Sequence, residues 1–135
     1  MIGLDTNVLV RYLAQDDAKQ AVLATRLIEK RLTTSNQGFI SLVVVAELCW
    51  VLSSLYAATV DELVETLEDL LNTPRFFLEK REVLQAAIAR LKSANSRKAG
   101  LADVLIAEIA AHAGCSATMT FDKTAARAAG MSLLV

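Results

Sequence analysis

Short apolar runs alternate along the chain with longer segments in which apolar residues recur every three or four positions. Apolar runs bounded by turn or cap residues predict strands, and the longer periodicity predicts amphipathic helices. The expected strands are Met1–Leu4, Gly38–Ser41, Arg75–Leu78, Ser116–Thr120 and Met131–Val135. The expected helices are a first one carrying Val8, Leu9, Tyr12 and Leu13, and then Ala18–Leu32, Leu42–Leu55, Thr59–Leu71, Glu82–Leu91, Leu101–Ala113 and Asp122–Ala129.

Strands that alternate with helices predict βαβ crossovers and a parallel sheet covered by helices on both faces. We therefore expect an α/β protein with a central, mainly parallel sheet of four to five strands. The chain has 135 residues and no repeat or linker-like tract, which predicts a single domain over residues 1–135. In such folds, ligands bind beyond the carboxyl ends of the strands, so candidate chemistry is expected there.

Three acidic residues stand where a strand ends or a helix begins. Asp5 and Asp122 each follow a predicted strand, and taken alone the N-cap of the next helix is the simpler explanation for each. Asp103 stands in the first turn of the helix Leu101–Ala113, where the helix dipole favours an acid. Each position therefore has a local structural explanation, and only the set as a whole points to chemistry.

Glu47 is harder to explain locally, because the helix predicted over Leu42–Leu55 is apolar on nearly all sides. Such a helix is expected to be buried, and an isolated buried carboxylate costs several kcal/mol. If buried, Glu47 is therefore expected to be neutral, paired or bound to a metal ion. The structural alternative is a glutamate that pairs with an arginine or emerges at a gap in the packing. Trp50 and Cys49, on the same helix, are expected to pack in the core or at an interface.

A parallel α/β fold can bring these four acids to one edge of the sheet, where they would repel one another unless a cation neutralised them. Carboxylate oxygens without histidine or thiolate suit Mg²⁺ or Mn²⁺. A metal held in this way activates water and stabilises charge on a phosphate. The sequence has neither a glycine-rich phosphate loop nor a second aspartate two residues after Asp5. Phosphodiester hydrolysis is therefore the chemistry that the pattern favours.

The charge balance changes the expected mode of binding. Fourteen basic and 15 acidic residues give a net charge of −1, which excludes a protein that grips nucleic acid through bulk positive charge but not one that binds it locally. The two cysteines, Cys49 and Cys115, lie among apolar residues and are more typical of a reduced pair than of a disulfide. Neither a signal peptide nor a membrane-spanning stretch is visible, so we expect a cytoplasmic location.

Four segments, in this order, resemble the motifs of PIN-domain ribonucleases of the VapC toxin group. They are Gly3–Leu13, Ile40–Leu48, Leu101–Ala107 and Thr120–Asp122. The resemblance covers essentially the whole chain, although residues 57–98 carry no family signature. It implies a three-layer α/β/α PIN-like fold and a Mg²⁺- or Mn²⁺-dependent endoribonuclease. It also implies that the chain is the toxin of a type II toxin–antitoxin pair, forming a homodimer and neutralised by a VapB-like antitoxin.

By position, the resemblance assigns the catalytic and metal-binding roles to four carboxylates and supporting roles to three polar residues. The carboxylates are Asp5, Glu47, Asp103 and Asp122, and the supporting residues are Thr6, Asn7 and Thr120. Basic residues close to these positions in the sequence are candidates for RNA binding. The simpler explanation is that they are ordinary charged residues exposed to solvent. They are Arg11, Arg97, Lys98 and Lys123.

Two other functions are compatible with the same residues. A PIN-like module could bind RNA or a protein through a site that is not catalytic, and saturable Mn²⁺ binding would argue against that alternative. A metal-dependent nuclease could also act on DNA, which side-by-side cleavage of RNA and DNA oligonucleotides would reveal.

Overall fold

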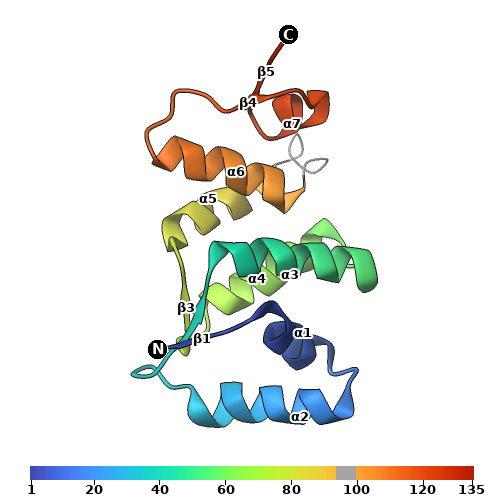
Figure 1. Ribbon diagram of the computed structural model, residues 1–135, viewed down its shortest axis with the longest axis vertical. Coiled ribbons are helices and arrows are strands. Elements are labelled where there is room, and N and C mark those ends of the chain that lie inside the picture. The colour runs from blue at the N-terminus through green and yellow to red at the C-terminus, as the bar shows by residue number, and fades with distance from the viewer. Residues whose placement is uncertain (94–99) are drawn as a thin grey trace. The chain divides into compact units, whose positions relative to one another are not determined.

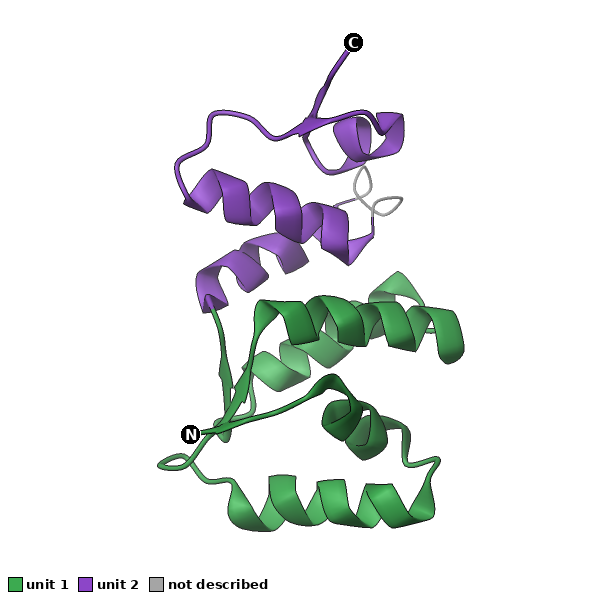
Figure 2. Ribbon diagram, viewed as in Figure 1, with its two compact units in different colours: residues 1–79 green, residues 80–135 purple. Residues whose placement is uncertain are grey.

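The computed structural model describes residues 1–93 and 100–135. The chain divides into two compact units, residues 1–79 and residues 80–135 (Figure 2). Both units combine helices with parallel strands, so the α/β class expected from the sequence is confirmed.

The first unit is built on a three-stranded parallel sheet (Figure 1). Its strands are β1 (Ile2–Gly3), β2 (Gly38–Ile40) and β3 (Phe76–Leu78), which are hydrogen-bonded in the order β1-β2-β3. Gly3 pairs with Phe39 of β2, which pairs in turn with Phe77 of β3. Because the strands are parallel and in sequential order, their carboxyl ends lie along the same edge of the sheet.

Two helical crossovers connect these strands. The first contains α1 (Thr6–Ala14), α2 (Ala18–Arg26) and a π-helical turn, η1 (Leu27–Arg31). The second contains α3 (Leu42–Leu55) and α4 (Val60–Leu71). Helix α1 packs against α2 and α3, and α4 packs against β3. The core of this unit consists of aliphatic side chains that are completely buried, namely Leu9, Ile40, Val45, Leu48 and Leu67.

The second unit begins with two helices that pack against each other, α5 (Arg81–Lys92) and α6 (Leu101–His112). A two-stranded parallel sheet follows, formed by β4 (Met119–Thr120) and β5 (Ser132–Leu133). The short helix α7 (Lys123–Ala128) lies in the crossover between these two strands and contacts both. The unit is therefore a helix pair followed by a small βαβ element.

Each strand and helix expected from the sequence has a counterpart, but the sheet is divided differently. The expectation was one central sheet of four to five strands, whereas the five strands found in residues 1–93 and 100–135 pair in two sheets of three and two. Regular pairing is also shorter than the apolar runs. Of the predicted strand Ser116–Thr120, only Met119–Thr120 pairs with β5. Among the described residues, no helix is long and apolar enough to cross a membrane.

The start of α3 is fixed at the carboxyl edge of the first sheet by two side chains. Ser41 is the N-cap, and its hydroxyl accepts a hydrogen bond from the Val44 amide at 3.2 Å. Glu79, the residue after β3, accepts a hydrogen bond from the Leu42 amide at 2.9 Å through Oε1. These contacts satisfy amides that the helix itself cannot pair. They tie the first turn of α3 to the ends of β2 and β3.

We expect Glu79→Ala to lower the free energy of unfolding by about 1–2 kcal/mol, because the partly buried Leu42 amide loses its acceptor. Glu79→Gln keeps a carbonyl oxygen at the same position and should lose less than half of that amount. Urea unfolding of the three proteins measures the difference. Equal losses in the two variants would contradict the capping role.

Candidate functional site

Asp5 stands at the carboxyl edge of the first sheet and is the N-cap of α1. Its Oδ1 accepts a hydrogen bond from the Thr6 amide at 2.9 Å, and the side chain is exposed. The backbone amide of Thr6 therefore orients this carboxylate. The Thr6 hydroxyl is itself buried and has no hydrogen-bond partner among the described residues.

The sheet edge that carries Asp5 holds a second acid that was not among the predicted site residues. Gly3, Phe39 and Phe77 are paired across the three strands. Two residues further along each strand come Asp5, Ser41 and Glu79, which are therefore in register with one another at the carboxyl ends of adjacent strands. Adjacent strands are about 4.8 Å apart, which puts the backbones of Asp5 and Glu79 about 10 Å apart. Glu79 directly follows the predicted strand Arg75–Leu78, just as Asp5 follows the first predicted strand. This position is the sequence signal that could have identified Glu79.

Glu47 is exposed, so the expectation of a buried carboxylate was wrong. Helix α3 buries one stripe of side chains against the core, consisting of Leu42, Val45, Leu48, Cys49 and Leu52. Its opposite face carries apolar residues that are nevertheless exposed, with Val43 at 77% and Trp50 at 65%. Glu47 lies between these two on the exposed face. Water therefore solvates its carboxylate, and no partner is required to compensate for burial.

Asp122 is the N-cap of α7 in the second unit. Its Oδ1 accepts hydrogen bonds from the amides of Thr124 at 2.7 Å and Ala125 at 3.2 Å. The hydroxyl of Thr120 accepts a hydrogen bond from the Asp122 amide at 3.0 Å. Thr120 thus orients the backbone of Asp122. The side chain of Asp122 remains exposed.

Asp103 lies in the first turn of α6 and is partly exposed. Within the described part of the chain, neither Asp103 nor Glu47 has a hydrogen-bond or ion-pair partner. Both carboxylates are therefore available to a ligand.

The predicted set draws two carboxylates from each unit, Asp5 and Glu47 from the first and Asp103 and Asp122 from the second. Within residues 1–93 and 100–135, no group of three or more histidine, cysteine, aspartate or glutamate side chains is arranged to hold a metal ion. The donor chemistry of the set nevertheless fits Mg²⁺ or Mn²⁺, since all four side chains offer carboxylate oxygen only. A shared metal site thus stays a prediction from the sequence.

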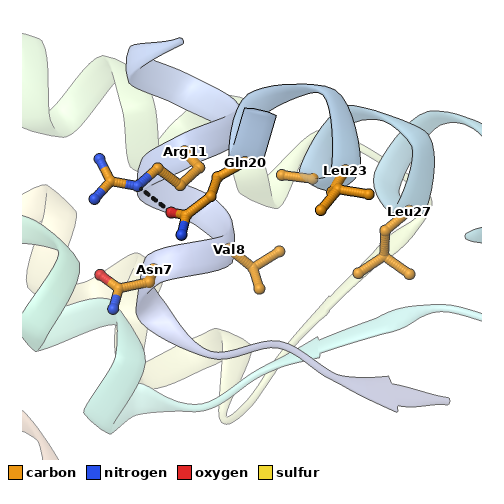
Figure 3. A pocket seen from close by; sticks show the side chains of 7 residues that line it. Asn7, Val8, Arg11, Gln20, Leu23 and Leu27 are labelled. Carbon is orange, nitrogen blue, oxygen red and sulfur yellow. Dashed lines mark hydrogen bonds between the residues drawn. The ribbon is translucent and has the colours of Figure 1, made fainter. Parts of the chain in front are cut away.

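A pocket of about 310 Å³ opens between α1 and α2 (Figure 3). It is lined by Asn7, Val8, Arg11, Gln20, Leu23, Ala24 and Leu27. The Nε of Arg11 donates to Oε1 of Gln20 at 2.7 Å, which links the two helices at the polar end of the pocket. Asn7 follows Asp5 by two residues, but its side chain lines this pocket and makes no hydrogen bond to Asp5 among the described residues.

The basic residues predicted to bind RNA differ in whether they are already paired within the protein. Arg11 pairs with Asp16 at 3.1 Å, and Asp16 also accepts a hydrogen bond from the Tyr56 hydroxyl at 2.6 Å. The guanidinium of Arg11 therefore already has partners within the protein. Lys123 is exposed directly after Asp122. Arg97 and Lys98 lie outside the described residues.

Cys49 does not add a nucleophile to the site. Cys49 is buried in α3, and burial raises the pKa of its thiol to about 12, so it stays protonated at neutral pH. Cys115 is exposed, and neither cysteine forms a disulfide.

The model of the PIN domain family matches residues 2–131, across both units. The chain belongs to the PIN domain family. PIN domains are generally nucleases and typically use divalent metal ions. Membership confirms the PIN-domain part of the resemblance, and the resemblance to the VapC toxin group stays a prediction. It also agrees with nucleic acid binding by this PIN domain. No curated protein and no solved structure matches it significantly.

The capping role of Asp122 can be tested by substitution. Asp122→Ala removes the acceptor of two amides and should lower the free energy of unfolding by about 1 kcal/mol, whereas Asp122→Asn keeps the cap and most of the stability. Chemical denaturation monitored by circular dichroism makes the comparison. If Asn were as destabilising as Ala, the cap would not explain the position.

The Tyr56–Asp16 contact predicts a pH-dependent effect. The hydrogen bond from Tyr56 lowers the pKa of Asp16 below its ordinary value of 3.8, with a smaller contribution from Arg11. A lowered carboxylate pKa stabilises the folded state above the ordinary value, and this stabilisation is lost as the pH falls through the lowered pKa. Tyr56→Phe should therefore lower the Tm at pH 7 and have a shrinking effect below about pH 4. A difference in Tm that stayed constant down to pH 2 would contradict this linkage.

Proposed function

We propose that this PIN domain is a Mg²⁺- or Mn²⁺-dependent endoribonuclease whose metal-binding carboxylates are Asp5, Glu47, Asp103 and Asp122. The observation that carries the proposal is that the family match spans all four acids while each keeps a carboxylate that water can reach. Two of the four also follow strands directly, where ligands bind in parallel α/β folds. RNA is proposed as the substrate because the motifs resemble those of PIN-domain ribonucleases.

In this proposal, Asp5, Glu47 and Asp103 would hold one ion directly or through water, and Asp122 would complete its shell or contact a second ion. When bound, such an ion would supply Lewis-acid chemistry that activates water and stabilises the charge on the phosphate. The Thr6 amide holds Asp5 and the Thr120 hydroxyl holds the backbone of Asp122, so both carboxylates are oriented before the substrate arrives. One carboxylate accepts a proton from the attacking water, whose oxygen bonds to phosphorus as the P–O bond to the leaving nucleotide breaks.

The biological role proposed for this activity is that of the toxin in a type II toxin–antitoxin pair in the cytoplasm. A VapB-like antitoxin would neutralise it, and the active form would be a homodimer. Exposed apolar side chains support a chain that binds protein partners, since Val22 is 50% exposed and Leu23 is 64% exposed on α2. A small upstream gene whose product co-purifies with this chain and blocks cleavage would support the toxin role. Its absence would leave the nuclease proposal intact.

Asp5→Asn should reduce metal-dependent RNA cleavage at least about 100-fold, since even the outer-shell partners of metal ligands account for 10–100-fold. The fold should be retained, because the asparagine carbonyl can still cap α1. The measurement maps cleavage sites in total RNA and in matched RNA and DNA oligonucleotides. EDTA should abolish cleavage, and added Mg²⁺ or Mn²⁺ should restore it.

Asp17→Asn is the matched control, because Asp17 caps α2 in the same unit through a 3.0 Å hydrogen bond from the Gln20 amide. It is outside the predicted set and should cleave RNA as the wild type does. Full activity of Asp5→Asn in a clean preparation would overturn the assignment, and preferential cleavage of DNA would overturn the choice of substrate.

A further inference from the structure

The two proposed metal-binding carboxylates of the second unit stand on separate groups of elements. Asp103 belongs to α6, which packs against α5, whereas Asp122 caps α7, which packs against β4 and β5. Among the described residues, neither α5 nor α6 contacts α7, β4 or β5 as extensively as the elements within each group contact one another. The placement of Asp103 relative to Asp122 therefore depends on individual contacts between the two groups.

The Arg90 side chain, on α5, is held by α6 on one side of its guanidinium. Its Nη1 donates a hydrogen bond to Oε1 of Glu108 at 3.4 Å, and the Glu108 side chain is only 14% exposed. Nδ1 of His112 lies 3.6 Å from the other carboxylate oxygen of Glu108. The Nε of Arg90 is buried and has no hydrogen-bond partner within residues 1–93 and 100–135. Because a poorly solvated carboxylate is costly without a counter-charge, Glu108 keeps the guanidinium in place.

The same guanidinium packs against the backbone of Gly130, in the turn between α7 and β5. Gly130 has a φ of +72°, and a Cβ added there would overlap Nη2 of Arg90 and lie 3.0 Å from its Cζ. Glycine is therefore needed twice, for the left-handed backbone and for the space that Arg90 occupies. Since Gly130 directly follows Ala129, the C-cap of α7, this contact fixes the end of the helix that Asp122 begins.

We propose that Arg90 is a positioning residue, which holds α6 and α7 in one orientation and thereby Asp103 in a fixed place relative to Asp122. The inference rests on the proposed nuclease function and deepens it, because it names a residue outside the four motifs on which metal binding depends. Partners that orient metal ligands without touching the metal commonly change metal affinity when they are substituted. Arg90 acts in this way through Glu108 and Gly130.

Gly130→Ala tests the contact without removing a charge, because the added methyl group displaces the guanidinium. Gly114→Ala is the matched control, since Gly114 also has a positive φ, +93°, in the same unit, but an added Cβ meets nothing within 4 Å. Both variants incur the cost of a left-handed alanine, and only Gly130→Ala disturbs Arg90. Residual dipolar couplings of the metal-free, full-length protein report the orientation of α6 relative to α7. We expect this orientation to change in Gly130→Ala and to stay as in the wild type in Gly114→Ala.

Calorimetric titration with Mn²⁺ alone, at a temperature at which every variant is folded, measures the consequence for the proposed metal site. Gly130→Ala should weaken Mn²⁺ binding about 10- to 100-fold, the range found for outer-shell partners of metal ligands, and Gly114→Ala should bind as the wild type does. Arg90→Met should resemble Gly130→Ala. Arg90→Lys should recover part of the affinity, because an ammonium can still pair with Glu108 but lacks the planar fork of the guanidinium.

An unchanged orientation of α6 and α7 in both Gly130→Ala and Arg90→Met would overturn the proposal. So would a changed orientation with unchanged Mn²⁺ affinity, or an equal loss of affinity in Gly114→Ala, which backbone strain alone would explain. Any of these results beside saturable Mn²⁺ binding and Asp5-dependent cleavage by the wild type would reject the role of Arg90 and keep the nuclease. A wild type that never binds Mn²⁺ saturably would reject the nuclease together with this role.

Discussion

Parallel pairing of strands only two or three residues long places all the strand ends of a sheet at one edge, and the candidate site depends on this constraint. In the first unit, the strand ends lead to Asp5, Ser41 and Glu79, and each of these side chains accepts a hydrogen bond from an amide in the first turn of a helix. In the second unit, β4 leads in the same way to Asp122. The polar groups gather there because helix N-termini and strand ends coincide.

The sequence predicts the elements well because their boundaries are set by local chemistry. Asp5, Ser41 and Asp122 cap helices whose starts follow from those residues, and apolar periodicity marks the helices behind them. The extent of strand pairing is not local, since it depends on what the partner strand offers. For this reason the strands are shorter than the apolar runs, and five strands form two sheets where one was expected.

The candidate site is less predictable than the fold, and Glu47 and Glu79 show why. The residues around Glu47 are apolar on all sides, so the sequence alone does not show which stripe of α3 faces the core. The stripe with Val43 and Trp50 faces water, which reverses the expected environment of Glu47. Glu79 belongs to no motif, and only the strand register places it level with Asp5.

Capping and metal binding make compatible demands on the same aspartates. A cap uses one carboxylate oxygen and a fixed backbone, which leaves Asp5 oriented and exposed before any ligand binds. With almost no net charge, the protein has no broad positive field to attract RNA. In the proposed function, affinity for RNA therefore depends on local contacts, namely the metal ion and a few basic residues.

The proposed nuclease requires that carboxylates of both units share one divalent ion. Titrating the isotope-labelled protein with Mn²⁺ and following the paramagnetic broadening of its amide signals tests this requirement most directly. We expect saturable broadening centred on Asp5, Glu47, Asp103 and Asp122 together, and its loss in Asp5→Asn. Broadening that never saturates, or that affects the acids of one unit only, would contradict a shared site.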